Sequence, residues 1–515
     1  MSDTFLSPEP VVKLEKRFTT AYQNFLATAR TCYSSKGIIP DEAIDEKWDF
    51  LAQSLYQAGH HTTLQHAHFQ FSLDRVSRHF IWSFLHSHPF YNSEQVSQRY
   101  VEVKPGNVVI PPLSGEALEV YQRMVHEQMD VYRSLCERLI PLAEAEYRKR
   151  FPKRPLEKRK SRSDIKKKAQ EVARYVLPVA THSYLYHTIS GITLLRYYRL
   201  CKSYDTPFEQ ELVVQKMINC LLEIEPKFEL ILEQPLEMEA HPEWQAYHTL
   251  PASPENTERF IQEFDASLDG RFSRLIDYKI NNESVLAASV REVLGIPRDT
   301  LADREAIELA LSPAKNHLLG ESLNLTTLSK LSRCLVHPNY TFRKKISHTA
   351  DSQDQRHRMT PASRPILAGH LNCQPDYITP ELIKQDDRIQ REYDEIMNRT
   401  WEAMNQMRTL GVRDEFVQYL LPNAVAIRFT ESADLLNLHH KHAMRLCYNA
   451  QEEIWRASLD EARQILEVNP IIGQFLLPPC TLRFLAKQRP ICPEGDRFCG
   501  EKVWLYDLDQ FQRII

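Results

Sequence analysis

Two long stretches of the sequence carry apolar residues at the spacing of an amphipathic helix. They cover residues 115–149 and 379–409, and in both of them apolar side chains recur every three or four positions. The second stretch begins with Thr379-Pro380-Glu381. Proline is favoured at the first helical position, because the N–H that it lacks would have no helical partner there. The pattern therefore predicts one long helix in each half of the chain, the second of them starting at Pro380.

Two shorter segments have the pattern of β-strands. Residues 68–73 and 339–347 alternate between apolar and polar side chains, and they are rich in aromatic residues or threonine. Each segment lies in the same half of the chain as one of the long helical stretches. The sequence therefore predicts an α+β fold, in which each half of the chain forms a small, mostly antiparallel sheet with long helices.

A faint internal repeat relates the two halves of the chain. Three short segments of the first half recur in the same order in the second half, which is typical of a duplicated unit. The pairs are LATARTCY and LAASVREV, GHHTTLQH and LNLTTLSK, and ARYVLP and VQYLLP, and they begin at residues 26 and 286, 59 and 323, and 173 and 417.

The repeat divides the chain into two related modules and two further segments. Residues 241–258 are polar and contain proline, as expected of a linker. The predicted divisions are a first module at 1–245, which includes a basic insert at 148–168, a linker at 246–268, a second module at 269–470, and a cysteine-containing tail at 471–515.

The composition is that of a soluble globular protein, with 43% hydrophobic and 26% charged residues among 515. Only 13 residues are glycine, which argues against glycine-rich nucleotide loops and favours helix. A net charge of −4 gives no overall attraction to nucleic acid or to a membrane. The chain has no run of 18 apolar residues, and its first residues lack the pattern of a signal peptide. We therefore expect a cytoplasmic protein with no membrane partner, whose ten cysteines are thiols or metal ligands.

Two short polar motifs are candidates for anion binding. Residues 355–358 read Gln-Arg-His-Arg, and guanidinium groups bind phosphate or carboxylate through paired hydrogen bonds. Residues 97–100 read Ser-Gln-Arg-Tyr, and they bring a hydroxyl, an amide, a guanidinium and a phenol together. Taken alone, each motif is also typical of a solvated loop.

The basic insert has 12 basic and 2 acidic residues, so it could bind RNA or an acidic partner. Its only aromatic residue is Phe151, whereas RNA-binding segments use several aromatic rings to stack on bases. We therefore expect a solvated, partly disordered insert. A further pair, His439 and His442, would share a helix face, but no acidic residue completes a metal site at helical spacing, so a mixed helix surface is favoured.

Cys480, Cys492 and Cys499 lie among the prolines and glycines that are typical of metal-binding turns. Their Cys-x11-Cys-x6-Cys spacing is not a standard zinc pattern, and the fourth ligand stays open between Cys447 and a histidine. The segment therefore allows two interpretations, a structural zinc site or a set of buried or free thiols. The zinc site is the hypothesis to be tested.

Taken in order, these motifs resemble the flavin-dependent thymidylate synthase family. The family signature runs from Gly-His-x-Ser/Thr-x-x-Glu-His through Arg-His-Arg, Ser-x-Arg-Tyr and Ala-Arg-x-x-Leu-Pro to a late Leu-Arg and an Ala-Gln-x-Glu-Ile segment. The first module resembles it at residues 59–66, 97–100 and 173–178. The second module resembles it at residues 356–358, 421–422, 444–446 and 450–454.

The resemblance implies an enzyme that methylates dUMP to dTMP, with FAD as its cofactor, NADPH as reductant and methylenetetrahydrofolate as one-carbon donor. The cofactor carries the chemistry in such an enzyme, so no side chain is assigned as catalytic. The residues implied in FAD binding are Arg356, His357, Arg358, Thr62 and Gln65. The residues implied in dUMP binding are Ser97, Gln98, Arg99, Arg174, Gln353 and Arg445.

Each module departs from the family pattern in a different place. Residues 86–88 of the first module read His-Ser-His where the family has Arg-His-Arg, and residues 361–365 of the second replace Ser-x-Arg-Tyr with a shortened segment. Because the losses are complementary, the resemblance implies one composite site built from both modules, in a homodimer that acts as a pseudo-tetramer. The family's flavin-contacting helix asparagines are replaced by Ser190, Arg196, Asp434 and His440.

Two other functions are compatible with the sequence. One is a flavin- and folate-dependent enzyme that acts on uridine in RNA, with the basic insert holding the RNA. The other is a non-catalytic descendant that binds a nucleotide or acts as a scaffold. The missing asparagines favour this second alternative, whereas the retained arginines speak against it. The charge balance does not lead us to expect nucleic acid as a partner.

Overall fold

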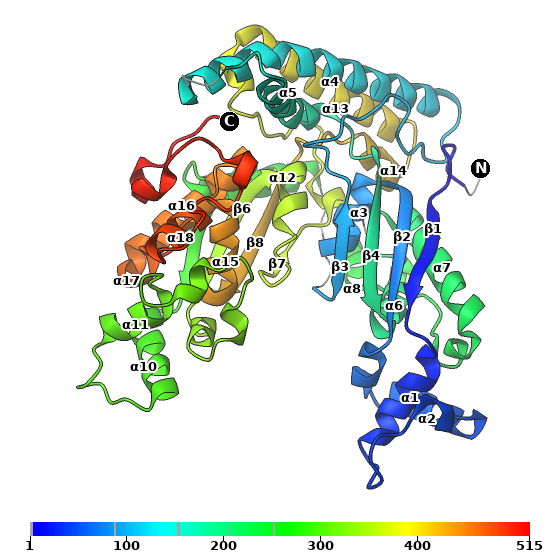
Figure 1. The fold of residues 1–515 in the computed structure, drawn as a ribbon. Coiled ribbons are helices and arrows are strands. Elements are labelled where there is room, and N and C mark those ends of the chain that lie inside the picture. The colour runs from blue at the N-terminus through cyan, green and yellow to red at the C-terminus, as the bar shows by residue number, and fades with distance from the viewer. Residues whose placement is uncertain (1–3, 87–88, 152–154, 204, 251–252) are drawn as a thin grey trace.

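The computed structural model describes the chain except for residues 1–3, 87–88, 152–154, 204 and 251–252. Two antiparallel four-stranded sheets dominate it, and their strands follow the same order, β1-β2-β4-β3 and β5-β6-β8-β7 (Figure 1). This arrangement confirms the predicted α+β fold and the duplication. The strands are β1 (Val11–Arg17), β2 (His68–Ser77), β3 (Tyr91–Gln95), β4 (His182–Ser190), β5 (Ser273–Tyr278), β6 (Asn339–Ser347), β7 (Ala362–Ser363) and β8 (Ala426–Asp434).

Strands β2 and β6 are the two that the alternating pattern predicted, and both are confirmed. In β2, the side chains of Phe69, Phe71 and Leu73 are buried, while those of Gln70 and Ser72 between them are partly exposed. Successive side chains of a strand point to opposite faces of the sheet. One face of the first sheet is therefore apolar and packs on helices, and the other face is polar.

An equivalent set of helices surrounds each sheet, and the apolar faces of sheet and helices form a core in each module. In the first module these helices are α1 (Ala21–Thr31), α2 (Asp49–Gln57), α3 (Arg78–His86), α6 (Gly191–Arg199) and α7 (Pro207–Ile224). In the second module they are α10 (Asn282–Leu294), α11 (Asp303–Leu311), α12 (His348–Asp354), α15 (Leu435–Arg445) and α16 (Glu452–Val468).

The two predicted long helices, α4 (Gly115–Arg150) and α13 (Asp387–Thr409), lie side by side across one end of both sheets (Figure 1). The predicted start of α13 at Pro380 is wrong. The helix begins at Asp387, because the side chain of Asp386 accepts hydrogen bonds from the backbone N–H groups of Arg388 and Ile389 at 2.9 and 3.1 Å. Pro380 lies ahead of a separate 3-10 turn at Ile383–Gln385.

The basic insert is more ordered than its composition predicts. From Arg159 onward it forms the first half of α5 (Arg159–Ala173), which packs against α4 and buries Ile165 and Ala169. The expectation of a partly disordered segment is therefore wrong for residues 159–168. An apolar stripe at helical spacing was present in the sequence but was outweighed there by the lysines and arginines around it.

The segment between the modules contains α8 (Pro242–Thr249) and α9 (Pro254–Leu268), and the region after α13 contains the short α14 (Asp414–Val417). Asp265 of α9 pairs with Lys345 and Arg428 of the second sheet, so α9 covers the polar face of that sheet. The C-terminal tail begins with α17 (Pro470–Gly473) and α18 (Pro479–Leu485). None of the helices in the described ranges is long and apolar enough to span a bilayer.

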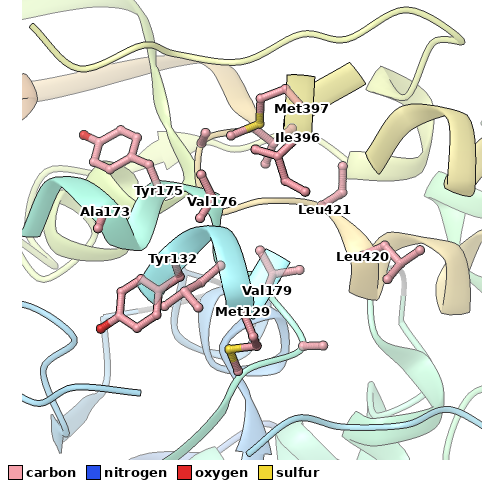
Figure 2. Close-up of a cluster of buried hydrophobic side chains, with 14 of the residues drawn as sticks. Met129, Tyr132, Ala173, Tyr175, Val176, Val179, Ile396, Met397, Leu420 and Leu421 are labelled. Atoms are coloured by element: carbon pink, nitrogen blue, oxygen red, sulfur yellow. The ribbon is translucent and has the colours of Figure 1, made fainter. Parts of the chain in front are cut away.

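One apolar core spans both modules (Figure 2). It lies between the long helices and the two Leu-Pro segments of the repeat, where Val176 and Val179 of the first module meet Leu420 and Leu421 of the second. Met129 of α4 contributes to the same core. The two modules therefore fold around one another and do not behave as independent domains on a tether.

The Leu-Pro segments hold this core together by exchanging backbone hydrogen bonds. The N–H of Val179 donates to the carbonyl of Leu421 at 2.8 Å, and the N–H of Asn423 donates to the carbonyl of Leu177 at 2.8 Å. Pro178 and Pro422 face one another at the centre of the exchange. The two segments are copies of one repeat, so the modules are related by an approximate two-fold axis here.

The same axis relates two buried glutamates. Glu209 accepts hydrogen bonds from the Ser77 hydroxyl of its own module and from the Tyr419 hydroxyl of the other module, both at 2.6 Å. Glu453 likewise accepts from the Ser347 hydroxyl and from the Tyr175 hydroxyl, both at 2.6 Å. Burial raises the pKa of Glu453 to about 7. Each module thus supplies the tyrosine that satisfies the buried glutamate of the other.

We expect Tyr175→Phe and Tyr419→Phe to destabilise the protein by similar amounts. Each change removes a donor from a buried carboxyl group, which costs about 1–3 kcal/mol. Urea unfolding followed by circular dichroism should give a lower midpoint for both variants. The matched control is Tyr184→Phe, because the Tyr184 side chain is 56% exposed. Midpoints that fall no further than in the control would contradict the importance of this exchange.

Candidate functional site

The Gln-Arg-His-Arg motif follows the end of α12 and reaches across to the first module. The guanidinium of Arg356 lies 2.9 and 2.8 Å from the two carboxylate oxygens of Glu94 in β3. Arg358 donates to the carbonyl of Pro89 at 3.1 Å and to the Asn92 side chain at 3.3 Å. The arginines of one module are therefore positioned on an edge strand of the other.

We call residues 355–358 the arginine loop. A pocket of about 270 Å³ opens where this loop meets the polar face of the first sheet. Arg356 and Arg358 line one side of it, and Gln70, Tyr186 and Thr188 are among the residues that line the other. Polar side chains beside an aromatic ring and two guanidinium groups form a suitable binding surface for a negatively charged, partly aromatic ligand.

His357, between the two arginines, is half-buried and neutral, and its Nε2 atom is buried. Burial holds its pKa well below the usual range, and the charges of Arg445 and Lys441 lower it further. Its Nε2 atom has no hydrogen-bond partner among the described residues, and the same holds for both side-chain polar atoms of Gln355. Buried polar atoms without partners are costly, so these three atoms point to a ligand that completes them.

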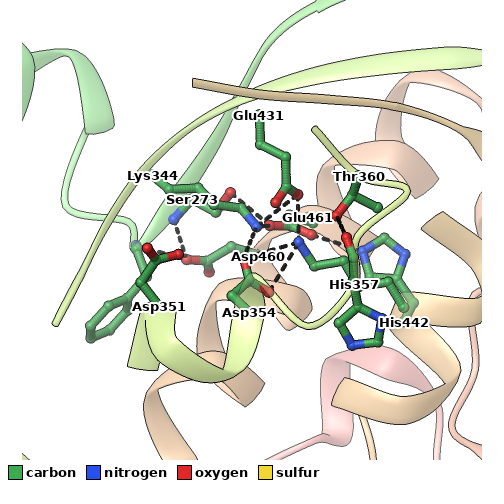
Figure 3. Close-up of polar contacts among 12 residues, drawn as sticks. Ser273, Lys344, Asp351, Asp354, His357, Thr360, Glu431, His442, Asp460 and Glu461 are labelled. Atoms are coloured by element: carbon green, nitrogen blue, oxygen red, sulfur yellow. Dashed lines mark hydrogen bonds and ion pairs between the residues drawn. The ribbon is translucent and has the colours of Figure 1, made fainter. Parts of the chain in front are cut away.

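The base of the arginine loop is fixed by a buried ion cluster (Figure 3). Asp354, the last residue of α12, lies 3.1 Å from the Nζ atoms of both Lys344 and Lys441. Lys344 also lies 3.0 Å from Glu431 and 2.7 Å from Glu461. Charges this deep are stable only when paired, so they fix α12 to the sheet and to α15 and α16.

Two of the three histidines of α15, His439 and His442, are the pair considered as metal ligands, and they belong to no group arranged as a metal site in the described part of the chain. His442 is buried, and its Nε2 atom lies 2.9 Å from Glu461 in the ion cluster. His439 is also buried, so the predicted mixed helix surface is wrong at both positions. The sequence pattern did not reveal the partner of His442 on α16.

Three arginines from both modules, Arg99, Arg174 and Arg445, lie beside the arginine loop, and we call them the arginine group. Arg99 donates to Glu171, which is also in the first module, and its second guanidinium nitrogen donates to the carbonyl of Asn449 at 2.9 Å. Arg445 donates to the carbonyl of Gln353 at 2.6 Å. The structure therefore places the predicted substrate residues of the two modules together within one chain.

Two members of the arginine group have guanidinium nitrogens that donate no hydrogen bond to the described residues. The Arg174 side chain is only 4% exposed, and one of its terminal nitrogens has no partner among the described residues; the same is true of the Nε atom of Arg445. Burial lowers the pKa of Arg445 to about 10, and the charges of Arg356 and Arg99 contribute. Buried and half-buried guanidinium groups that repel one another and keep unpaired nitrogens form a strong anion site.

One counter-charge lies within this group. Burial alone would raise the pKa of Glu171, but the charges of Arg99, Lys168 and Arg174 hold it well below its usual range, so Glu171 is ionised. A fourth arginine, Arg513 of the C-terminal tail, is also buried, and its two terminal nitrogens have no partner among the described residues. Sequence reasoning missed Arg513, because no motif surrounds it.

The predicted ligand residues that are not charged lie in two separate places. Ser97 accepts a hydrogen bond from the N–H of Arg99 at 3.2 Å, and Gln98 accepts one from Asn423 of the second module at 3.1 Å. Both therefore lie at the junction of the modules. Thr62 and Gln65 lie elsewhere, in the 3-10 turn at His61–Gln65, which packs against α1 and α6 of the first module. Neither hydrogen-bonds to the arginine loop within the described part of the chain.

The approximate two-fold axis relates the position of the arginine group to a second position between the modules, which we call the second junction. In this chain, buried side chains fill the second junction. Arg364, from the segment that replaces Ser-x-Arg-Tyr, forms two hydrogen bonds of 2.7 and 2.8 Å with Asp351. The indole N–H of Trp82 donates to the same carboxylate at 2.7 Å. All three side chains are buried. Of the His-Ser-His segment beside them, residues 87–88 lie outside the described residues.

The cysteines predicted to bind zinc lie in the tail, where Cys480, Cys492 and Cys499 are free thiols. In the described part of the chain, no group of three or more His, Cys, Asp or Glu side chains is already arranged as a metal site.

Comparison with known proteins places both modules in one family. The model of the family described as "Thymidylate synthase complementing protein" matches residues 13–227 and again residues 274–471. Two curated relatives are both named flavin-dependent thymidylate synthase. The protein from Pyrococcus furiosus is 29% identical over 180 residues, 33% of this chain and 73% of the relative. The protein from Pyrococcus abyssi is 28% identical over 186 residues, 34% of this chain and 76% of the relative.

Among solved structures, the comparison finds the UMP/dUMP methylase PolB from Streptomyces cacaoi, crystallised with 5-Br dUMP. It is 20% identical in sequence, and the match covers 43% of this chain and 94% of PolB with a TM-score of 0.32. The family assignment therefore depends on the two sequence matches, which between them span most of both modules. The chain belongs to the thymidylate synthase complementing protein family and carries the family unit twice.

Proposed function

We propose that the protein is a flavin-dependent thymidylate synthase that methylates dUMP to dTMP at a composite site of its two modules. Methylenetetrahydrofolate supplies the methylene carbon, and NADPH supplies the two electrons that reduce it to a methyl group, leaving tetrahydrofolate and NADP⁺. Family membership and the names of the curated relatives support this proposal. The observation that carries it is the group of buried and half-buried arginines at the junction of the modules, two of which, Arg174 and Arg445, have unpaired nitrogens.

The arginine group suits the phosphate of dUMP. A nucleoside monophosphate carries close to two negative charges, and its oxygens accept several hydrogen bonds each. Arg174 of the first module and Arg445 of the second have unpaired nitrogens that would donate to it. Arg99 lies between them and is already oriented by Glu171 and by the carbonyl of Asn449. The site is therefore preorganised for an anion before the ligand arrives.

The arginine loop and its pocket suit FAD. Arg356 and Arg358 would bind its phosphates, and the unpaired polar atoms of Gln355 and His357 would bind a heterocyclic ring. When bound, FAD supplies the redox chemistry of the reaction. Neutral His357 can donate or accept one hydrogen bond without adding charge. The ion cluster at Asp354 holds the loop in position for this role.

The closed second junction accounts for the number of sites. Because Arg364, Asp351 and Trp82 fill that junction, each chain has one site where two family units would have two. We therefore propose a homodimer with one working site per chain, which acts as a pseudo-tetramer. Purified protein that carries the absorbance bands of flavin and converts dUMP to dTMP in the presence of both co-substrates would support the proposed function. Protein that binds no added FAD would overturn it.

We expect Arg356→Ala and Arg358→Ala to weaken FAD binding much more than dUMP binding. A charge-assisted hydrogen bond to a phosphate contributes about 1.5–3 kcal/mol, which corresponds to about 10–150-fold in affinity. Titration with FAD, followed by flavin fluorescence, measures the effect. Arg298→Ala is the matched control, since Arg298 is exposed and pairs only with Asp303 of its own module. Unchanged FAD affinity in both loop variants would remove the loop from the site.

We expect Arg99→Ala and Arg445→Ala each to weaken dUMP binding by at least about tenfold, because both remove charge from one phosphate. The double variant should lose less than the product of the two effects, since both residues act on the same ligand. Isothermal titration with dUMP measures the three affinities, and Arg133→Ala, an exposed arginine of α4, is the control.

Mixing the two single variants tests the placement of the site. Arg99 contacts Asn449, four residues after Arg445, within one chain. Mixed dimers should therefore regain no dUMP binding or activity. Recovery after subunit exchange would show that the site spans two chains, and normal dUMP affinity in either single variant would rule out the composite site.

A further inference from the structure

Four of the ten cysteines line one small, enclosed cavity of about 10 Å³. They are Cys447, Cys480, Cys492 and Cys499, so the cavity adds Cys447 to the three cysteines of the tail. A volume of this size holds one atom-sized occupant and no more. The remaining lining is mostly apolar or aromatic, with prolines at residues 478, 479 and 493, and Glu494 is its one charged residue.

The four cysteines come from separate parts of the chain. Cys447 follows the end of α15, Cys480 lies in the first turn of α18, and Cys492 and Cys499 lie in the turns beyond it. Gly495 and Gly500 in those turns adopt φ angles of +51° and +91°, which other residues adopt only at a cost. The chain therefore uses special backbone geometry to bring the last two thiols to the cavity.

We propose that Cys447, Cys480, Cys492 and Cys499 bind one structural zinc ion. Four thiolates are a standard ligand set for structural zinc, which takes four ligands in a tetrahedron. The four thiols line one cavity but are not already arranged as a metal site in the described part of the chain, so binding requires their side chains to turn toward a central ion.

The zinc ion would tie the tail to the anion site. Cys447 lies between Arg445 and Asn449, the residue whose carbonyl accepts from Arg99. The tail that carries the other three cysteines also carries Arg513, on which the charges of Glu171 and Arg99 act. Zinc therefore fixes two elements of the site, even though it touches none of the reacting atoms.

Metal analysis of the full-length protein, purified under reducing conditions without chelator, tests the proposal. We expect about one zinc per chain by mass spectrometry of the elements. Cys480→Ser and Cys492→Ser should each lower this to a small fraction of an equivalent, whereas the matched control Cys334→Ser, a buried free thiol of the second module, should keep its zinc. Wild-type protein with well under half an equivalent of zinc, or variants that retain full zinc, would overturn the proposal.

A second measurement on the wild-type protein covers the possibility that the variants fail to fold. Replacing the metal with Co²⁺ should produce the intense absorption of tetrahedral cobalt thiolate, and bound metal should protect these four cysteines, but not Cys32 or Cys373, from alkylation. Alkylation of all four at the rate of the exposed pair would contradict the site. Iron with acid-labile sulfide in place of zinc would replace this proposal with an iron–sulfur cluster.

Discussion

The structure depends on one reciprocal interaction, the exchange of the two Leu-Pro segments across the approximate two-fold axis. Each segment presents its backbone to the other and sends a tyrosine to the buried glutamate of the opposite module. Each glutamate also accepts from the N–H and the hydroxyl of a serine in its own module, and the tyrosine adds a donor from the opposite module. Loss of that donor would cost about 1–3 kcal/mol, a sizeable share of the stability of a typical domain, so the exchange constrains the two modules to fold together. The common apolar core above the exchange follows from that constraint.

This constraint leaves the two junctions free to diverge. The paired contacts are made by backbone groups, tyrosines and glutamates, and Arg174 enters them through its backbone carbonyl, which accepts from the Asn423 side chain, and not through its guanidinium. One junction keeps arginines with free donors, and the other is filled by a buried pair of Arg364 and Asp351 with Trp82. The modules diverge in their interiors too. Leu73 and Lys344 occupy matching positions in β2 and β6. An apolar side chain of the first module is thus replaced at this position by a lysine of the ion cluster in the second.

Much of the fold was predictable because it depends on local pattern. Strands β2 and β6 show the alternation, and α4 has its apolar stripe. The failures arise where distant partners decide the outcome. In α5, the many lysines suggested a disordered segment and hid the apolar stripe that packs on α4. In β6, no residue near Lys344 in the sequence indicates that three carboxylates surround it. For the site, the family resemblance identified the arginines, but the unpaired donors of Arg513 are visible only in three dimensions.

The duplication also explains how a chain can lose half of its ligand residues and still fold. A single-module protein that assembles through identical copies must use the same residues for packing and for every site, so a change at one site is a change at all of them. Here the packing residues of the exchange are retained in both modules, whereas ligand residues are retained in one module each. Filling the second junction with Arg364 replaces a ligand site by a buried ion pair, which fixes the geometry of the junction without a ligand. The fold and the site thus rest largely on separate side chains, although Gln98 and the backbone of Arg174 contact Asn423 in both, and selection can act on one with little effect on the other.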